Sequence, residues 1–350
     1  MRVLVTGGAG FIGSHIVDLL VAADHEVVVL DCLHPAAHRS IPDDLDPRVD
    51  YHWNDVKDLG AVVSLTRGVD AVCHQAAMVG LGVDFGDVTD YVAENDLGTA
   101  TLLRALHDGA WSGRLVLASS MVVYGEGISR CDQHGVVRPP PRDADALKIG
   151  QFEPTCPHCG RALVPVSVPE DSYPDPRNVY AATKLHQEHL CNAFAREHSG
   201  VAVTALRYHN VYGPRMPRNT PYAGVASIFR SALERGESPQ VYEDGGQLRD
   251  FIHVRDIARA NFLALTNEAT PGGTYNIATG MPRTVLDMAE ALARAFGPGV
   301  LQPTVTGAWR PGDVRHVFAS TDRAAEHLGF RAEISFSDGM QEFATAALRS

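Results

Sequence analysis

The chain is short of basic residues and has no long hydrophobic run. Its 350 residues carry 30 Lys and Arg against 42 Asp and Glu, a formal net charge of −12. Nucleic acids are bound through clustered Lys and Arg, so we do not expect DNA or RNA as a partner. No segment approaches the roughly 18 uninterrupted apolar residues that a membrane helix needs. A membrane partner is therefore not expected either.

The amino-terminal segment and the few cysteines indicate the compartment. Residues 1–20 lack the basic start and long apolar stretch of a secretory signal, so we predict a cytoplasmic protein. Its 6 cysteines are then expected to be thiols or metal ligands rather than disulfides. With 45% hydrophobic and 21% charged residues, the composition is that of an ordinary globular protein. A chain of this length usually divides into two lobes.

Short apolar strands alternate with helices of apolar spacing along the first two hundred residues. This alternation predicts an α/β fold, a Rossmann-type doubly wound parallel sheet with helices on both faces. We expect strands at 2–6, 26–30, 51–53, 71–75, 115–119 and 203–208, and helices at 11–21, 88–107, 179–198, 223–234, 255–267 and 285–295.

Two domains are expected from the change of rhythm along the chain. Residues 1–210 are predicted to form the Rossmann domain, with a Pro-rich insertion at about 129–172 that fits neither period. Residues 211–350 are predicted to form mainly a smaller C-terminal substrate-binding lobe. Some of its segments, at about 250–280, are expected to return to the first domain.

A glycine-rich loop, TGGAGFIG at 6–13, joins the first strand to the first helix. Glycines there permit a tight turn and a close approach of a pyrophosphate to the free N–H groups at the helix start. About twenty residues later, Asp31 can accept hydrogen bonds from a ribose 2′-hydroxyl and would repel a 2′-phosphate, so NAD is favoured over NADP. The predicted cofactor contacts are Gly7, Gly10, Phe11, Ile12, Gly13 and Asp31, joined by Asp55 and Val56 if Asp55 reads the adenine edge rather than serving as a turn residue.

Tyr180 and Lys184 are four residues apart, so they share one face of a predicted helix. A phenol has an unperturbed pKa near 10, and a nearby cation such as Lys184 favours the phenolate. The pair alone is a common surface pattern. The run ASSMVVYG at 118–125, at the end of a predicted strand, makes it more specific.

With these motifs the chain resembles the extended short-chain dehydrogenase/reductase superfamily, in its NAD-dependent nucleotide-sugar epimerase/dehydratase branch. Further matching motifs are HQAA at 74–77, RYHNVYGP at 207–214, RDFIHVRD at 249–256 and RPGD at 310–313. The resemblance implies that Tyr180 is the catalytic base, that Lys184 binds the nicotinamide ribose, and that Ser120 hydrogen-bonds the reacting sugar hydroxyl. It adds Ala76, Ala77, Asn95, Ser119, Tyr180 and Lys184 as cofactor contacts. Its contacts to the nucleotide-diphosphate sugar are Ser120, Tyr180, Asn210, Arg249, Arg310 and Asp313.

Dehydratases of this family carry an Asp-Glu pair directly after the Ser or Thr. Here these positions are Met121 and Val122, which cannot transfer a proton, so dehydration is disfavoured. We expect a 4-epimerase that oxidises a sugar hydroxyl and returns the hydride to the other face. The alternatives are an epimerase of UDP- or GDP-sugars, a related NAD-dependent nucleotide-sugar decarboxylase or dehydrogenase, or a non-catalytic NAD-binding interaction protein. The resemblance also implies a homodimer.

Two short metal-ligand patterns lie in the insertion, Cys131-Asp-Gln-His134 and Cys156-Pro-His-Cys159. Their spacing is typical of a structural zinc site closed by four ligands, with His158 as the competing ligand. The alternative is unliganded thiols. Such a segment is expected to form a zinc-ribbon-like lid over the active site, and it resembles a bacterial subgroup that acts on dTDP-6-deoxyhexoses such as dTDP-L-rhamnose. The other cysteines, Cys32, Cys73 and Cys191, are expected to be small core residues.

Overall fold

We describe a computed structural model of the chain, covering residues 1–35, 37–80, 85–218, 224–310 and 312–349. Two positions that the sequence analysis used fall outside these ranges. They are Ala223, at the start of a predicted helix, and Pro311 of the RPGD motif.

A seven-stranded, all-parallel sheet forms the centre of the larger domain. Its strands follow the order β3 (Asp50–His52), β2 (Glu26–Leu30), β1 (Arg2–Thr6), β4 (Ala71–His74), β5 (Gly113–Ser120), β9 (Val201–Tyr208) and β14 (Gly273–Ile277). The predicted Rossmann-type fold is confirmed. The strand order reverses between β1 and β4, and in such folds ligands bind at the carboxyl ends of the strands at this point.

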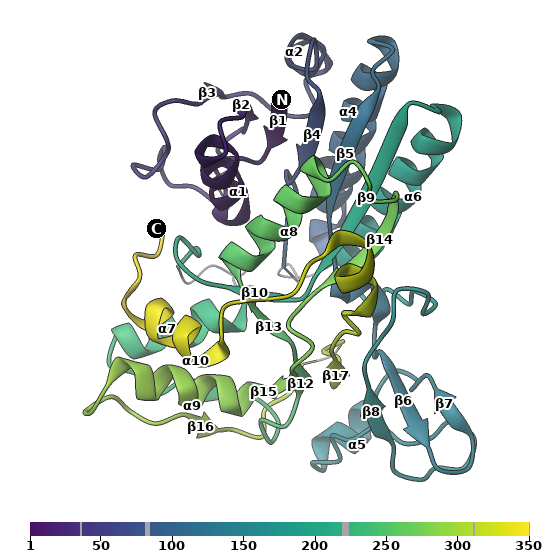
Figure 1. The fold of residues 1–350 in the computed structure, drawn as a ribbon. Coiled ribbons are helices and arrows are strands. Elements are labelled where there is room, and N and C mark those ends of the chain that lie inside the picture. Colours follow the sequence, from purple (N-terminus) through teal and green to yellow (C-terminus); the bar gives the residue numbers. More distant parts are fainter. Residues whose placement is uncertain (36, 81–84, 219–223, 311, 350) are drawn as a thin grey trace.

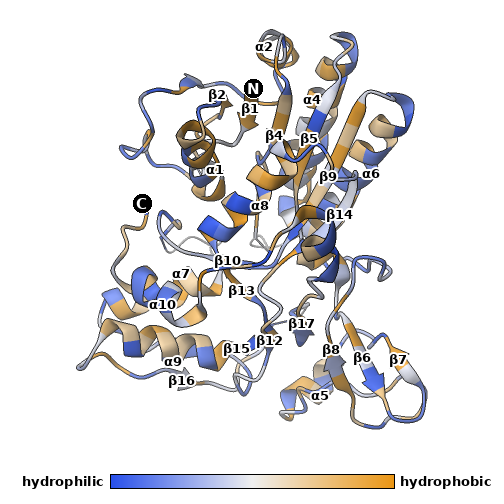
Figure 2. Cartoon of the chain, viewed as in Figure 1, coloured by the Kyte–Doolittle hydropathy of each residue, from blue (hydrophilic) through white to orange (hydrophobic). Residues whose placement is uncertain are grey.

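Helices cover both faces of the sheet because alternate strand residues point to opposite sides. In β1, Val3 and Val5 pack in one core with α1 (Phe11–Ala22) and α8 (Val254–Thr266). Leu4 packs in the other core, against α2 (Leu59–Leu65), α4 (Gly98–Asp108) and α6 (Val179–Glu197). Figures 1 and 2 show these layers and the apolar residues between them.

The predicted helix at 88–107 is divided into three pieces, and a short turn precedes the first of them. A short turn η1 (Phe85–Asp87) and α3 (Val88–Tyr91) lead into a π-helical segment η2 (Val92–Leu97), which continues into α4. The wide turn holds Asn95 fully buried. Its side chain bonds the backbone of Met78 and the hydroxyl of Thr183, so tertiary contacts set this departure from regular helix.

The second lobe packs around a separate apolar core formed mainly by α7 (Val225–Glu234), α9 (Val285–Phe296) and α10 (Phe336–Thr345). This half of the chain also forms short paired strands: β10 (Asn210–Tyr212) with β13 (Phe251–His253), β11 (Gln240–Val241) with β16 (Thr304–Val305), and β12 (Leu248–Arg249) between β15 (Arg283–Thr284) and β17 (His316–Val317). The chain then closes with the turn η4 (Ala324–Leu328) and α10. Within this carboxyl-terminal half, α8 and β14 belong to the larger domain.

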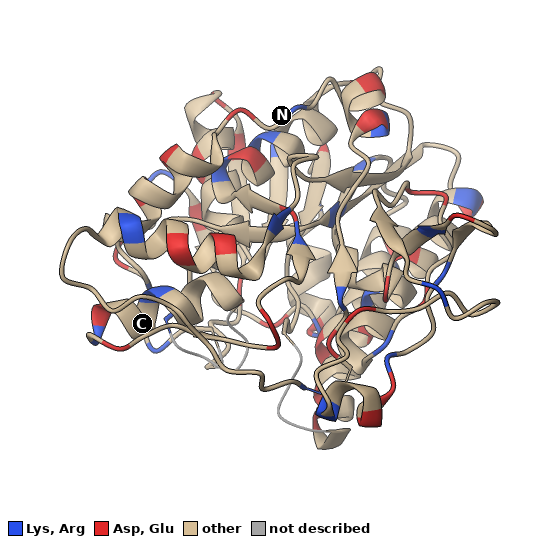
Figure 3. Ribbon diagram, turned by 90° about the horizontal axis from the view of Figure 1, so that it is seen from below, with Lys and Arg blue, Asp and Glu red and all other residues tan. Residues whose placement is uncertain are grey.

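The insertion forms a small body of its own beside the second lobe (Figure 1). After the turn η3 (Met121–Tyr124), β6 (Ile128–Cys131) pairs antiparallel with both β7 (Gly135–Val137) and β8 (Val164–Val166), and α5 (Ala144–Lys148) lies between β7 and β8 in the chain. Charges of both signs are distributed over the whole ribbon (Figure 3). No helix in the described part of the chain has the length and apolar character needed to cross a bilayer.

Buried histidines make the fold sensitive to acid. Burial lowers the pKa of His74 and His253 to about 3 and that of His209 to about 4. Between these values and about 6.5 the unfolded chain binds protons that the folded chain does not, so stability falls as the pH falls through this window. At pH 5, His74 alone is expected to cost about 2 kcal/mol.

Urea unfolding at pH 7.5 and pH 5 tests this expectation. We expect a His74→Asn variant to lose about 2 kcal/mol less than the parent between the two pH values. The matched control is His327→Asn, because the His327 side chain is 40% exposed. Equal pH dependence in the His74 variant and the parent would contradict the assignment.

Candidate active site

The glycine-rich loop forms a tight cradle at the carboxyl end of β1. Gly7 has a φ of +68°, and its carbonyl oxygen accepts the Gly10 N–H at 3.1 Å. A Cβ at Gly13 would lie only 2.1 Å from that same oxygen, so the first turn of α1 requires glycine there. Among the described residues, no side chain caps α1 at Gly10. The free N–H groups of this helix start are suited to the pyrophosphate of a dinucleotide.

Asp31 follows β2 and faces the same loop. Its two carboxylate oxygens accept the N–H groups of Ala9 at 3.0 Å and Leu33 at 2.9 Å. Asp55 lies in the neighbouring turn after β3, where it accepts the Lys57 N–H at 2.8 Å. Asp31 and Asp55 line one large cavity. The residues present therefore fit a dinucleotide with an unphosphorylated ribose.

Ser120, Tyr180 and Lys184 meet where β5 ends beside α6. Ser120 caps η3 by accepting the Val122 N–H, and Asn178 caps α6 through the Ala181 N–H at 2.8 Å. The ammonium of Lys184 donates to the Ala118 carbonyl at 2.9 Å and lies 5.9 Å from the centre of the Tyr180 ring. The predicted trio is thus assembled by one strand end and one helix.

Burial controls protonation in this trio. It raises the pKa of Tyr180 to about 12, against an opposing hydrogen bond with Ser120. It lowers the pKa of Lys184 to about 7, because the low-dielectric surroundings disfavour the ammonium. Without ligand, Tyr180 is therefore a neutral phenol at pH 7, and added positive charge is needed to release its proton.

One cavity of about 740 Å³ joins the loop, the trio and the second lobe. Most of the residues that the sequence indicated line it: Gly7, Gly10, Phe11, Ile12, Gly13, Asp31, Asp55, Val56, Ala76, Ala77, Ser119, Ser120, Tyr180, Asn210, Arg249, Arg310 and Asp313. Asn95 and Lys184 are absent from the lining. They lie behind it, where Asn95 fixes Met78 and Lys184 fixes the end of β5.

The far end of the cavity is rich in charge. The Arg249 guanidinium donates to the carbonyls of Val314 at 2.6 Å and Arg315 at 2.9 Å, and that of Arg310 lies 4.7 Å from the ring centre of Tyr242. Burial raises the pKa of the Asp313 carboxyl, while Arg310 and Arg249 oppose the rise. Planar guanidinium groups at this end are suited to phosphate oxygens.

Some lining residues were not expected from the sequence. Tyr242 and Gln247 lie on loops of the second lobe, and Arg177 precedes the Tyr180 helix; no motif marked them. Cys32 was expected in the core but is exposed and lines the cavity. It follows closely after β2, at the carboxyl ends of the sheet strands, where the cavity lies. Cys73 and Cys191 are buried as expected.

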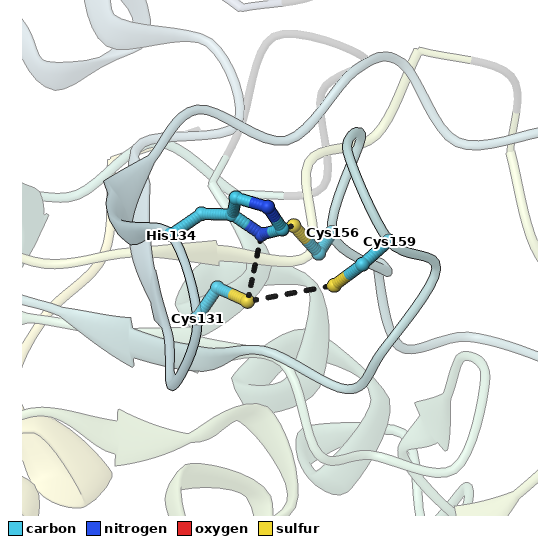
Figure 4. A group of neighbouring side chains, drawn as sticks. All are labelled: Cys131, His134, Cys156 and Cys159. Atoms are coloured by element: carbon cyan, nitrogen blue, oxygen red, sulfur yellow. Dashed lines mark hydrogen bonds between the residues drawn. The ribbon is translucent and has the colours of Figure 1, made fainter.

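Four side chains of the insertion converge on one point (Figure 4). The ligand atoms of Cys131, His134, Cys156 and Cys159 all lie within 4.8 Å of one another. The Cys131 sulfur is 3.7 Å from that of Cys159 and 3.5 Å from Nδ1 of His134. Ligands around a tetrahedral zinc are separated by about 3.8 Å (S to S) and about 3.6 Å (S to N). The donor set and its spacing thus fit zinc.

The expected lid over the active site has no counterpart in the described lining of the cavity. None of residues 129–172 is among the described residues that line the cavity. The insertion contacts the second lobe through Arg142, which pairs with Glu243, and through Glu153, which pairs with Arg315.

Most of the chain matches the sequence pattern of one known family. The sequence profile described as "NAD dependent epimerase/dehydratase family" matches residues 3–144 and 162–278. The chain belongs to this family. The profile omits residues 145–161, which hold Cys156 and Cys159, so this part of the insertion is an addition to the family pattern.

Relatives and solved structures cover nearly the full length. The dTDP-L-rhamnose 4-epimerase of Burkholderia thailandensis is 33% identical, over 98% of this chain and 94% of that protein. The UDP-glucose 4-epimerase of Thermus thermophilus, solved in complex with NAD, superposes with a TM-score of 0.78 at 31% identity, with 98% of each chain covered. That of Thermotoga maritima, solved with UDP-glucose, gives 0.79 at 29% identity, over 98% of this chain and 97% of that one. The chain is an NAD-dependent enzyme of the nucleotide-sugar epimerase family.

Proposed function

We propose that the protein is a nucleotide-sugar 4-epimerase that works through a transient 4-keto-sugar, with dTDP-6-deoxyhexoses such as dTDP-L-rhamnose as its substrates. The observation that carries the reaction type is the apolar wall beside the trio: Met121 and Val122 follow Ser120 and both line the cavity. No carboxylic acid stands at these two positions to expel water from the sugar. The proposed substrate rests on the likeness to the Burkholderia enzyme.

The roles of the side chains follow from their positions. The glycine-rich loop and Asp31 would hold NAD, which would supply a reversible hydride acceptor for the sugar carbon. Tyr180 holds the proton of the reacting hydroxyl in turn, and Ser120, to which it is hydrogen-bonded, orients that hydroxyl. Lys184, anchored on Ala118, brings a positive charge near the phenol when it is protonated, and burial lowers its pKa to about 7. Arg249, Arg310, Asn210 and Asp313 surround the diphosphate end.

Incubation of the purified enzyme with dTDP-L-rhamnose, without added NADH, tests this function. We expect a product of unchanged mass with an altered proton coupling at C4 in the NMR spectrum. If that sugar does not react, UDP- and GDP-sugars distinguish a different epimerase from a decarboxylase or dehydrogenase. Loss of water or carbon dioxide, or net reduction of NAD, would overturn the epimerase assignment. Binding of NAD with no turnover of any of these sugars would favour a non-catalytic protein.

A structural zinc ion in the insertion is the second part of the proposal. All four positions are filled by protein ligands, so the ion has no site for substrate. We expect about one zinc ion per purified chain by elemental mass spectrometry, and its loss in Cys159→Ser. Cys32→Ser is the matched control, since Cys32 lies outside the cluster. Zinc retained in Cys159→Ser would rule out this ligand set.

A cytoplasmic location is an expectation from the sequence, and a homodimer is an expectation from the family likeness. Val92 and Leu97 of η2 are 44% and 53% exposed, which suits a pairing face. Light scattering of the purified protein measures the oligomeric state. A monomer at micromolar concentration would contradict the expected dimer.

A further inference from the structure

A short segment of the second lobe, residues 313–316, lies between the substrate cavity and the insertion. On the cavity side, Asp313 and Val314 line the wall, and Arg249 donates to the carbonyls of Val314 and Arg315. The backbone of this segment therefore sets where Arg249 and Asp313 stand. Both belong to the proposed diphosphate end.

On the opposite side, the insertion holds the same segment. Arg142 donates to the Asp313 carbonyl at 2.6 Å, and its Nη1 lies 2.8 Å from Oε1 of Glu243. Glu153 accepts from Arg315 at 2.9 Å and pairs with His316 at 2.8 Å. Two side chains of the insertion thus contact three of the four residues.

The contacts form a buried charge network. The Arg315 guanidinium, 2% exposed, pairs with Glu243 at 2.8 Å and Asp244 at 2.7 Å, and its backbone N–H donates to Glu126 at 2.8 Å. The side chains of Arg142 and Glu243 are 5% and 1% exposed. Charges with so little water around them interact strongly, and removing one partner leaves the other buried and unpaired. Small displacements of Arg142 are therefore transmitted to the segment, and Glu153, whose side chain is 55% exposed, adds a contact that water screens more strongly.

The metal cluster lies close to these side chains in the chain. Glu153 is three residues before Cys156, and Glu126 is five residues before Cys131 at the end of β6. Cys156 is held in its turn by bonds to Arg161 and Gly160, at 2.8 Å each. The insertion contributes a core of few apolar residues, Cys131, Val137, Cys156 and Leu163. A body this small needs a metal or a comparable cross-link to keep one shape.

We infer that the metal-bound insertion holds residues 313–316 in position, and we call this role the brace. Arg142 and Glu153 are then positioning residues for the nucleoside diphosphate of the substrate. The inference rests on the proposed function. Loss of the metal loosens Glu153 and Arg142, displaces Arg249 and Asp313, and weakens diphosphate binding. The glycine-rich loop, which joins β1 to α1 in the other domain, keeps its affinity for NAD.

Calorimetric titration of the NAD-loaded enzyme with dTDP and with UDP tests the brace. After the metal is removed by a chelator under reducing conditions, we expect the affinity for the tighter nucleotide to fall by about tenfold, the effect of misplacing one hydrogen bond to a charged group. NAD content should not change, and added Zn²⁺ should restore binding. An unchanged diphosphate affinity, an equal loss of NAD, or a protein without metal would overturn the inference. If neither nucleotide binds the untreated enzyme, the proposed function itself fails.

Variants separate the brace from general loss of structure. In Arg142→Lys the charge is kept but the fork that reaches both Glu243 and Asp313 is lost; in Glu153→Gln the shape is kept but the charge is lost. For both we expect a higher KM for the nucleotide sugar, with kcat and zinc content close to the parent. Lys148→Ala is the control, because Lys148 lies in the insertion but pairs only with exposed Asp145 among the described contacts. A fall in kcat at constant KM would contradict a positioning role.

Discussion

Replacing Tyr180 by Phe is expected to abolish epimerisation while leaving NAD binding intact. The change removes a single oxygen, the atom that is hydrogen-bonded to Ser120. Loss of a positioned acid or base lowers the rate by about 10² to 10⁴-fold. Tyr180 lies on α6, whereas the dinucleotide cradle lies on β1 and α1. We therefore expect the turnover number to fall below detection in the NMR assay, with NAD still bound at the parent's stoichiometry.

The matched control is Tyr173→Phe, because Tyr173 is 79% exposed and lies outside the cavity lining. It should retain full activity. A pH profile adds a further check: the parent's rate should fall as the pH rises above about 7, because Lys184, whose pKa burial lowers to about 7, then loses the charge that favours the phenolate. Residual activity above about a tenth of the parent's in Tyr180→Phe, well outside the loss expected for an acid or base, would remove this residue from its role.

Gly13→Ala is expected to abolish tight NAD binding. The added methyl would stand 2.1 Å from the Gly7 carbonyl oxygen and 2.9 Å from Gly8 Cα, and both contacts are with backbone that cannot rotate away. The loop must therefore open, which displaces the N–H groups suited to the pyrophosphate. Because several hydrogen bonds to charged oxygens are misplaced together, we expect the affinity to fall by about 100-fold. Titration with NAD after removal of bound cofactor measures this fall.

Gly60→Ala provides the comparison for this loss. Gly60 also lies in the first turn of a helix, but its nearest neighbour is the Asp58 side chain at 3.3 Å. The control should bind NAD like the parent. Thermal unfolding of both variants without NAD shows whether Gly13→Ala is still folded. A folded Gly13→Ala variant with the parent's affinity for NAD would contradict the assignment of the glycine-rich loop as the pyrophosphate site.

The sequence predicted those strands and helices whose own residues carry a regular apolar pattern. The strands β1, β2, β4 and β5 each contain a short run of apolar residues, and α1 and α6 have apolar residues at helical spacing. In contrast, the π turn at η2 depends on contacts of Asn95 with Met78 and Thr183, which are distant in the chain. No local pattern could indicate them.

The same distinction holds for the site. Motifs of fixed spacing brought Gly13, Ser120 and Tyr180 into one cavity, as the resemblance implied. The exposure of Cys32 and the absence of a lid among the described residues depend on where whole segments pack. The partnership of Arg142 with Asp313 joins residues 171 positions apart, and a single sequence offers no signal for it.

The strand β14 ties the two lobes together during synthesis as well as in the finished molecule. It enters the sheet beside β9, where Tyr275 pairs with Leu206 and Ile277 with Tyr208. The edge of β9 therefore stays open until residue 277 has left the ribosome, and an open apolar edge is prone to pair with other chains. A shortened chain that ends before β14 would expose this edge permanently. Segments of the substrate lobe lie on both sides of β14 in the chain, so removing that lobe by truncation would also remove an edge strand of the large sheet.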